Sequence, residues 1–194
     1  MEPPVRQIGI FGGSFNPIHV GHIALARQLL TTLRLDEVWF VVSPLNPFKT
    51  TASDLLDDHL RYQMVALALR DEPGLEASDC EFHLPRPSYM YNTLCHLSAR
   101  YPHARFTLLI GADNWIAFDR WAHARDIVAQ YRVAVYPREG YEVCPASLPP
   151  HVVYVPSSLY PVSSTLIRQR VRAGQSVAVL VPPAILPLVQ RYYR

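Results

Sequence analysis

A glycine-containing turn between a strand-like segment and a helix-like segment is the feature that most constrains this sequence. Residues 7–11 read Gln-Ile-Gly-Ile-Phe, which is typical of a buried strand, and residues 23–33 have the apolar spacing of a helix. Residues 12–22 between them read Gly-Gly-Ser-Phe-Asn-Pro-Ile-His-Val-Gly-His. This order of strand, turn and helix start places backbone N–H groups and the positive end of a helix dipole where an anion can bind.

Two histidines end this segment. His19 and His22 are three residues apart, so on a helix their side chains point the same way and can contact one polyphosphate. A single histidine at a helix start is more often a cap or a surface residue, and Gly12-Gly13 is common in strand-to-helix turns. The complete pattern Phe-x-Pro-x-His-x-Gly-His, however, indicates a nucleotide site.

The rest of the chain alternates between strand-like and helix-like segments. The strand-like segments are 37–42, 75–78, 106–110, 132–136 and 152–155, and the helix-like segments are 55–68, 92–101, 121–128, 163–174 and 182–193. This alternation predicts an α/β fold, a Rossmann-like doubly wound parallel sheet with helices on both faces. With 194 residues and neither a repeat nor a linker, we expect residues 1–194 to form a single domain.

Composition excludes several classes of protein. The net charge is +2 and the basic residues form no dense cluster, so we expect no nucleic-acid partner. Prolines interrupt the longest apolar stretches, and the first residues lack the pattern of a secretory signal, so we expect no membrane span. Cys80, Cys95 and Cys144 are widely spaced, which favours free buried thiols in a reducing compartment. These features predict a cytoplasmic protein and leave a homo-oligomeric state open.

Two further polar segments follow predicted strands. Residues 111–113, Gly-Ala-Asp, end the strand at 106–110, and residues 163–168, Ser-Ser-Thr-Leu-Ile-Arg, open a helix. Taken alone, the serines are an ordinary helix cap and Arg168 is a solvated charge. In open parallel sheets, however, ligands bind beyond the carboxyl ends of the strands, where residues 12–22 also lie. A helix start with an arginine one turn later is suited to binding phosphate.

The sequence lacks the motifs of several other nucleotide-using enzymes. It contains no Gly-x-x-x-x-Gly-Lys-[Ser/Thr] loop and no Gly-x-Gly-x-x-Gly fingerprint. No Gly-x-Ser-x-Gly elbow or Cys-His pair indicates a covalent nucleophile. A donor-rich site without a nucleophile favours direct transfer between two bound substrates, which the protein positions while it stabilises developing charge.

These segments resemble the nucleotidyltransferases that carry a His-x-Gly-His motif, and among them the bacterial nicotinate mononucleotide adenylyltransferases. The resemblance runs from the first strand to the helix containing Arg168. It rests on residues 12–22, 46–49, 87–93, 110–114 with the following Trp121, and 163–168.

The resemblance implies that ATP and nicotinate mononucleotide give nicotinate adenine dinucleotide (deamido-NAD) and pyrophosphate, a reaction of NAD biosynthesis. It implies Mg²⁺ bound with ATP and no metal held by protein ligands. Catalytic roles would fall to His19, His22, Lys49 and Arg168. The family pattern assigns ATP binding to Gly12, Gly13, Ser14, Phe15, Gly111, Asp113, Ser164 and Thr165, and mononucleotide binding to Tyr89, Thr93, Trp121 and Arg138. Trp121 and Tyr89 are equally compatible with a role as core aromatic residues.

The chain departs from the family pattern at four positions. The family often has Pro-Pro-His-Lys where residues 46–49 read Asn-Pro-Phe-Lys, and Ser-Tyr-Thr-x-Asp-Thr where Met90 and Asn92 replace threonine and aspartate. Because Met90 and Asn92 border the expected mononucleotide pocket, nicotinamide mononucleotide or another phosphate monoester, such as phosphopantetheine, remains an alternative acceptor. A non-catalytic nucleotide sensor is the alternative from another class.

Overall fold

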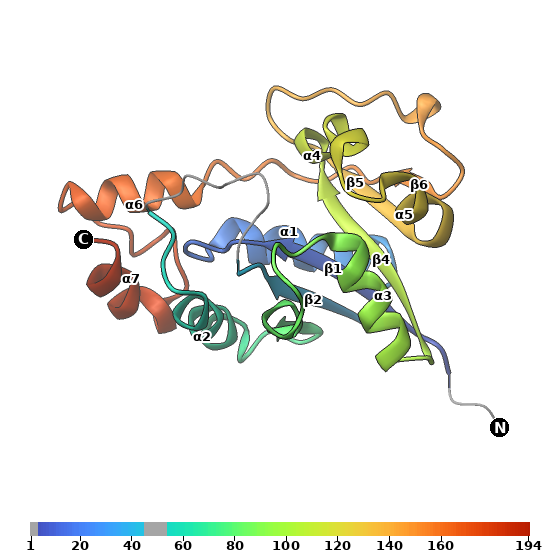
Figure 1. Cartoon of the computed structure of the whole chain (residues 1–194). Helices are drawn as coiled ribbons and strands as arrows, with labels where there is room; N and C mark the ends of the chain where they lie inside the picture. Colours follow the sequence, from blue (N-terminus) through green and yellow to red (C-terminus); the bar gives the residue numbers. More distant parts are fainter. Residues whose placement is uncertain (1–3, 45–53) are drawn as a thin grey trace.

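The computed structural model describes residues 4–44 and 54–194, and these form one six-stranded sheet with helices around it (Figure 1). The strands pair in the order β3-β2-β1-β4-β5-β6, and every pair is parallel. The strands are β1 (Arg6–Gly13), β2 (Glu37–Val42), β3 (Leu75–Ser78), β4 (Ala104–Gly111), β5 (Arg132–Tyr136) and β6 (Val152–Tyr154).

Helices connect successive strands, as parallel pairing requires. The α-helices are α1 (Val20–Thr32), α2 (Asp58–Leu69), α3 (Met90–Arg100), α4 (Ala112–Ile116), α5 (Ala124–Gln130), α6 (Ser164–Arg172) and α7 (Leu186–Tyr192). Four short 3₁₀ helices are η1 (Cys80–His83), η2 (Phe118–Arg120), η3 (Pro145–Ser147) and η4 (Pro183–Ile185).

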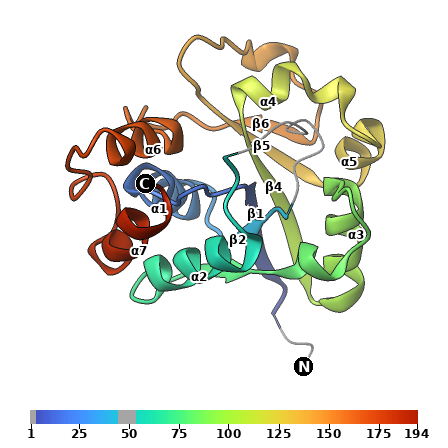
Figure 2. The ribbon, with the colours of Figure 1, turned by 60° about the vertical axis from the view of Figure 1, so that its left-hand side comes forward.

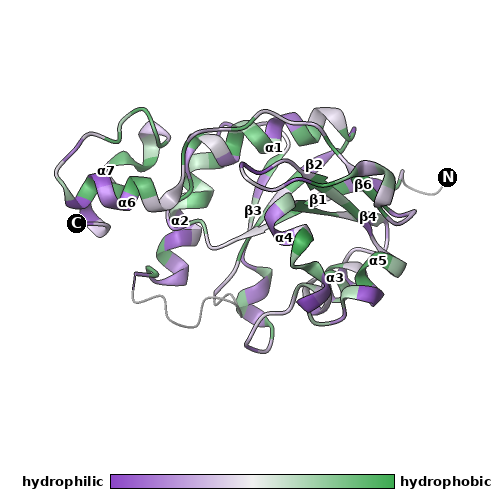
Figure 3. Cartoon of the chain, turned by 90° about the horizontal axis from the view of Figure 1, so that it is seen from above, coloured by the Kyte–Doolittle hydropathy of each residue, from purple (hydrophilic) through white to green (hydrophobic). Residues whose placement is uncertain are grey.

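The two faces of the sheet have separate hydrophobic cores. On one face, Phe11 and Phe40 pack with buried side chains of α1, α2, α6 and α7. On the other face, Ile10 and Leu108 pack with buried side chains of α3 and α5. Figure 2 shows these two groups of helices on opposite sides of the strands. Strands buried on both faces are expected to be apolar along their length, and β1 and β2 are green in Figure 3, whereas α1 shows both colours.

The strand order places the candidate residues. β1 pairs with β2 on one side and with β4 on the other, so the order reverses at the gap between β1 and β4. Gly12 is opposite Val41 of β2, and Gly111 is opposite Tyr136 of β5. The carboxyl ends of four strands therefore meet at one edge, the usual location of ligands in such sheets.

The predicted fold class is confirmed, and most of the predicted strands agree closely with the structure. The segments 37–42, 75–78 and 132–136 are strands with those bounds. The predicted helix at 182–193 is instead divided into η4 and the short α7, and Pro187 lies in the first turn of α7. Proline lacks the N–H that continues a helix but is tolerated in a first turn, which explains the break before it.

Two expectations from the sequence, about membrane spans and about the cysteines, can be compared with the structure. Among residues 4–44 and 54–194, no helix combines the length and hydropathy needed to cross a membrane. The three cysteines are free thiols, but the predicted burial is wrong for Cys144, which is exposed, whereas Cys80 and Cys95 are partly buried. Burial raises the pKa of the Cys80 thiol to about 11.

Candidate active site

A cavity of about 800 Å³ opens at the carboxyl edge of the sheet and brings together most of the residues predicted for the site. The chain reaches it from the ends of β1, β4 and β5 and from the starts of α1, α3 and α6. The predicted residues that line it are Gly12, Gly13, Ser14, Phe15, His19, His22, Tyr89, Asp113, Trp121, Arg138, Ser164, Thr165 and Arg168. Lys49 lies outside the described residues, so its predicted role stays a prediction.

The turn after β1 is shaped by a buried aromatic ring. Phe15 has a positive φ of 44°, which is uncommon for a residue with a side chain. Its ring is held between Phe40 and His22, with ring centroids 5.3 and 5.2 Å away. A Cβ added to Gly13 would lie 2.9 Å from this ring, so a side chain at position 13 would displace Phe15. The glycine therefore permits the close turn that brings the backbone to the cavity.

His19 and His22 form a reciprocal cap at the start of α1. His19 is the N-cap residue, and its Nδ1 accepts a hydrogen bond from the His22 N–H at 3.3 Å. The His22 Nδ1 in turn accepts one from the His19 N–H at 3.2 Å. The two rings stack, with centroids 3.6 Å apart. Because Nδ1 is an acceptor in both rings, each neutral ring has its hydrogen on Nε2, which can donate to a ligand.

Burial keeps both imidazoles uncharged. Desolvation, with a smaller contribution from the nearby Arg138 guanidinium, lowers the pKa of His19 to about 4. Desolvation, followed by His19 and Arg138, lowers the pKa of His22 well below its usual value. At neutral pH the pair thus offers two neutral N–H donors, and the positive charge that the described residues bring to this cavity belongs to arginines.

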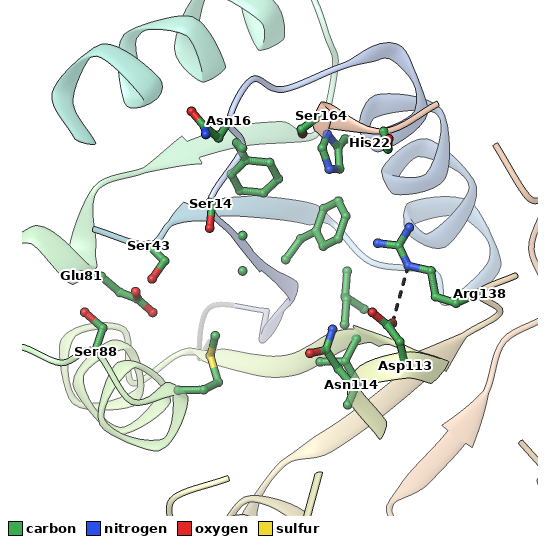
Figure 4. A pocket seen from close by; sticks show the side chains of 18 of the residues that line it. Ser14, Asn16, His22, Ser43, Glu81, Ser88, Asp113, Asn114, Arg138 and Ser164 are labelled. Carbon is green, nitrogen blue, oxygen red and sulfur yellow. Dashed lines mark ion pairs between the residues drawn. The ribbon is translucent and has the colours of Figure 1, made fainter. Parts of the chain in front are cut away.

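The start of α6 is docked onto the turn after β1. Ser163 caps α6 by accepting a hydrogen bond from the Leu166 N–H at 3.1 Å. Ser164 Oγ donates to the Pro17 carbonyl at 2.8 Å, and Arg168 donates to the Asn16 carbonyl, also at 2.8 Å. Figure 4 shows Ser164 and His22 on the same wall of the cavity. Two helix starts and one arginine therefore face a common space, as residues 12–22 and 163–168 predicted.

Asp113 and Arg138 face each other across the ends of β4 and β5. Arg138 Nε lies 3.7 Å from Asp113 Oδ1, the ion pair drawn in Figure 4, and its guanidinium lies 5.4 Å from the centre of the Tyr136 ring. Gly111 does not line the cavity, but a Cβ there would collide with both Asp113 and Arg138. The predicted importance of Gly111 thus has a steric basis, since it leaves room for this pair.

Two aromatic side chains form another part of the wall. Tyr89 is exposed at the start of α3, with 39% of its surface accessible. Trp121 is partly buried and packs on Phe118 at 5.1 Å between ring centroids while it also lines the cavity. Trp121 is therefore both a core contact and a cavity residue.

The structure places Thr93 behind the wall rather than in the cavity. Thr93 is fully buried in α3, and its hydroxyl donates to Glu81 Oε1 at 2.8 Å. The predicted direct contact with a mononucleotide is thus corrected, because the hydroxyl is occupied by a protein carboxylate. The residue spacing predicted α3, but it did not show which side of the helix faces the cavity.

Comparison with known proteins places this chain in a family. A sequence model of the cytidylyltransferase-like family matches residues 10–170. A protein of Bacteroides fragilis named as a probable nicotinate-nucleotide adenylyltransferase is 49% identical over 92% of this chain and 89% of its own. A protein of Bacteroides thetaiotaomicron with the same name is 45% identical over 97% of this chain and 93% of its own. The chain belongs to the nicotinate-nucleotide adenylyltransferases. It is thus a nucleotidyltransferase of the cytidylyltransferase-like family.

A solved structure of an enzyme with a related name has a similar fold. The nicotinic acid mononucleotide adenylyltransferase of Plasmodium falciparum, solved in complex with NaAD, superposes with a TM-score of 0.77. The match covers 96% of this chain and 94% of that one, at 19% sequence identity. At this level of identity the likeness concerns the fold.

Arg61 is a site residue that the sequence did not reveal. It is fully buried, and its guanidinium donates to the carbonyls of Ser14 and Ser43 and, at 2.8 Å, to that of Leu56. In a trans peptide the C=O and N–H point in opposite directions. Binding of the Ser14 carbonyl to Arg61 therefore turns the Phe15 N–H away from Arg61. The sequence offered one signal for this role, because Arg61 lies on the apolar side of the helix predicted at residues 55–68.

Asn16 and Tyr193 connect the two ends of the chain at this site. The Tyr193 hydroxyl, which is buried, donates to Asn16 Oδ1 at 2.8 Å. The Asn16 side chain also accepts from the Leu56 N–H at 3.2 Å and donates to the Asp54 carbonyl at 2.8 Å. Burial raises the pKa of Tyr193. Asn16 belongs to the recognised motif, whereas no local pattern marks Tyr193.

The histidine pair predicts a pH-dependent stability. In the unfolded chain His19 has a pKa near 6.5, but in the folded chain it is about 4, so only the unfolded chain binds this proton between these values. The free energy of unfolding should therefore fall as the pH is lowered from 6.5 towards 4. The His19→Asn, His22→Gln double variant keeps groups that can cap a helix and should show a shallower fall in urea denaturation.

The exposed His103→Asn variant is the matched control, and it should keep the full slope. Burial raises the pKa of Glu81, which gives a dependence of opposite sign, but Glu81 is the same in all three proteins. If the free energy of unfolding falls equally steeply with pH in the double variant and in the original chain, the pH dependence does not come from the histidine pair.

Removal of the Tyr193 hydroxyl should loosen the turn after β1. Tyr193→Phe leaves Asn16 Oδ1 with one donor fewer, so we expect the free energy of unfolding to fall by about 1 kcal/mol. Tyr192→Phe is the control, because the Tyr192 hydroxyl has no hydrogen bond to the described residues. Urea denaturation of both variants tests this, and indistinguishable midpoints would show that the buried bond contributes nothing.

Proposed function

We propose that this protein transfers AMP from ATP to nicotinate mononucleotide, giving nicotinate adenine dinucleotide and pyrophosphate. The observation that supports this most is the placement of His19, His22 and Arg168 in one cavity with Tyr89 and Trp121. The volume of about 800 Å³ lies in the upper part of the usual range for ligand pockets, about 300–1,000 Å³. The cavity thus offers phosphate-binding donors and aromatic surfaces in a space large enough for two nucleotides.

The chemistry we propose is a single displacement. A phosphate oxygen of the mononucleotide attacks the α-phosphorus of ATP and forms the new P–O bond. The bond from the α-phosphorus to the oxygen shared with the β-phosphorus breaks, and pyrophosphate leaves with that electron pair. Both reactants are anions, so the protein must supply donors and positive charge where they meet.

The donors at the two helix starts are suited to hold the triphosphate of ATP. His19 and His22 donate through Nε2, and Arg168 supplies a permanent positive charge. Binding at helix starts also uses the backbone N–H groups and the positive dipole ends there. The other groups that we assign to ATP are the backbone of the turn Gly12, Gly13, Ser14 and Phe15, the hydroxyls of Ser164 and Thr165, and Lys49.

The other half of the cavity is suited to the sugars and the pyridine ring. We assign the Asp113 carboxylate, in the space left by Gly111, to the ribose of ATP. Tyr89 and Trp121 present aromatic faces for the pyridine ring of the mononucleotide. Arg138 lies beside Asp113 and near both histidines, and we assign it to the mononucleotide phosphate.

Mg²⁺ would enter as part of the substrate, bound to the ATP phosphates, where it would neutralise charge. Within residues 4–44 and 54–194 no group of three His, Cys, Asp or Glu side chains is arranged to hold a metal ion. The residues that we assign to the phosphates, His19, His22 and Arg168, offer N–H groups, which complement the anionic oxygens of a metal–triphosphate complex rather than a free cation.

Pyrophosphate release with alternative acceptors tests the function. Purified protein with ATP and Mg²⁺ should release pyrophosphate with nicotinate mononucleotide, and more slowly with nicotinamide mononucleotide or phosphopantetheine. Faster release with phosphopantetheine would assign a different acceptor. Tight ATP binding without release with any of the three would show a nucleotide sensor.

Loss of the His22 imidazole should slow the chemical step. His22→Ala removes the Nε2 donor, so we expect kcat to fall about 10²- to 10³-fold. His103→Ala, at an exposed histidine of the opposite edge of the sheet, is the control. A His22→Ala enzyme with the kcat of the control would remove His22 from the mechanism.

A further inference from the structure

A polar cluster with an acidic centre occupies the wall of the cavity near β2 and β3. It consists of Ser43, which follows β2, Glu81 in η1, and Ser88, which precedes α3. Figure 4 shows these three side chains facing one another, across the cavity from Arg138 and Asp113. The functional assignments above use none of the three.

Two atoms of this cluster are buried without a partner. Glu81 is 3% exposed, and its Oε1 accepts the hydrogen bond from Thr93. Glu81 Oε2 and Ser88 Oγ have no hydrogen-bond partner in the part of the chain that the structure describes. Buried polar atoms are rarely left unpaired, because the loss of water must be offset by another hydrogen bond. A ligand in the cavity is a natural source of the missing donor.

The chemistry of Glu81 limits what that ligand group can be. An ionised carboxylate has only acceptor atoms. Burial raises the pKa of Glu81, whereas the hydrogen bond from the Thr93 hydroxyl acts against this shift and favours the ionised form. Such a group repels a phosphate or a second carboxylate. It therefore fits a neutral donor, such as a sugar hydroxyl, which acidic side chains commonly bind in nucleotide sites.

The position of the cluster selects the substrate. Ser88 immediately precedes Tyr89, which we assigned to the pyridine ring, and Met90 of the same segment reaches the backbone at Gly12. The phosphate-binding residues His22 and Arg168 belong to other walls of the cavity. In a mononucleotide the ribose connects the phosphate to the pyridine ring, so its hydroxyls are the neutral donors nearest this segment.

We propose that Glu81, with Ser88 beside it, binds a ribose hydroxyl of the mononucleotide substrate through Oε2. Thr93 then acts as a positioning residue, because its hydroxyl fixes the other oxygen of the same carboxylate. This assigns a mononucleotide-binding role to Glu81 and explains why Thr93 lies behind the wall. The proposal rests on the proposed function, since it needs a mononucleotide as the acceptor.

The test combines a protein change with a substrate change. The protein variants are Glu81→Gln, Ser88→Ala and, as a control on the exposed part of β3, Glu76→Gln. The substrates are the mononucleotide and its 2′-deoxy and 3′-deoxy analogues, assayed at saturating ATP. Removing the bound hydroxyl should lower kcat/KM about ten- to hundredfold for the original protein and for Glu76→Gln, the loss expected for a hydrogen bond to a charged group.

In Glu81→Gln, replacing the mononucleotide with the same deoxy analogue should lower kcat/KM less than threefold, because the hydroxyl has already lost its charged partner. In Ser88→Ala, the factor by which the deoxy analogue lowers kcat/KM should lie between the factors for Glu81→Gln and for the control. KM for ATP should stay unchanged in Glu81→Gln, and its thermal midpoint should be no lower than that of the control, because the change removes a buried charge.

Several results would overturn the proposal. If each deoxy analogue loses the same factor in Glu81→Gln as in the original protein, Glu81 is structural only. If Glu81→Gln changes only the preference between the pyridine acid and the pyridine amide, the unpaired oxygen faces the ring substituent instead. Absence of turnover in the original protein with any mononucleotide would mean that the proposed function has failed, which is a separate outcome.

Discussion

The binding of one turn by side chains from distant helices is the interaction on which the site depends. Three carbonyl groups after β1, those of Ser14, Asn16 and Pro17, are bound by Arg61, Arg168 and Ser164. A turn that presents its N–H groups to an anion needs its carbonyls satisfied elsewhere, because an unpaired buried carbonyl is costly. α2 and α6 satisfy them, and Tyr193 after α7 holds the Asn16 side chain. Helices on one face of the sheet thus shape a ligand site at its edge.

Charge is distributed unevenly in the cavity, and this gives direction to a bound substrate. Arg138 lies near the uncharged histidines and Arg168 binds the turn that precedes them, whereas the buried carboxylate of Glu81 lies across the cavity from Arg138. In the function we propose, phosphates would be drawn to one region and neutral hydroxyls to the other. Neutral imidazoles would donate to the phosphates without adding positive charge that holds pyrophosphate after the reaction.

Much of this arrangement could be predicted from the sequence, because its signals are local. Apolar runs gave the strands 37–42 and 132–136, and the order of segments gave the parallel sheet. The residues that end strands or begin helices, such as Asp113 and Arg168, were correctly expected in one place, since parallel strands bring their carboxyl ends together. The His19 and His22 pattern indicated a shared direction, although not the stacking and the reciprocal cap.

What the sequence could not predict depends on contacts between distant segments. Tyr193 and Asn16 are separated by nearly the whole chain, and no spacing rule relates them. Thr93 looked like a ligand residue because it belongs to a motif, but the packing of α3 turns it towards Glu81.

In the proposed reaction two bound substrates react with each other, with no covalent intermediate on the protein. The decisive measurement is the stereochemistry at the α-phosphorus, followed with ATP that carries sulfur in place of one α-phosphate oxygen in a single configuration. One in-line displacement predicts a dinucleotide with inverted configuration at that phosphorus. Retention of configuration would require two displacements through an enzyme-bound nucleotide and would rule out direct transfer.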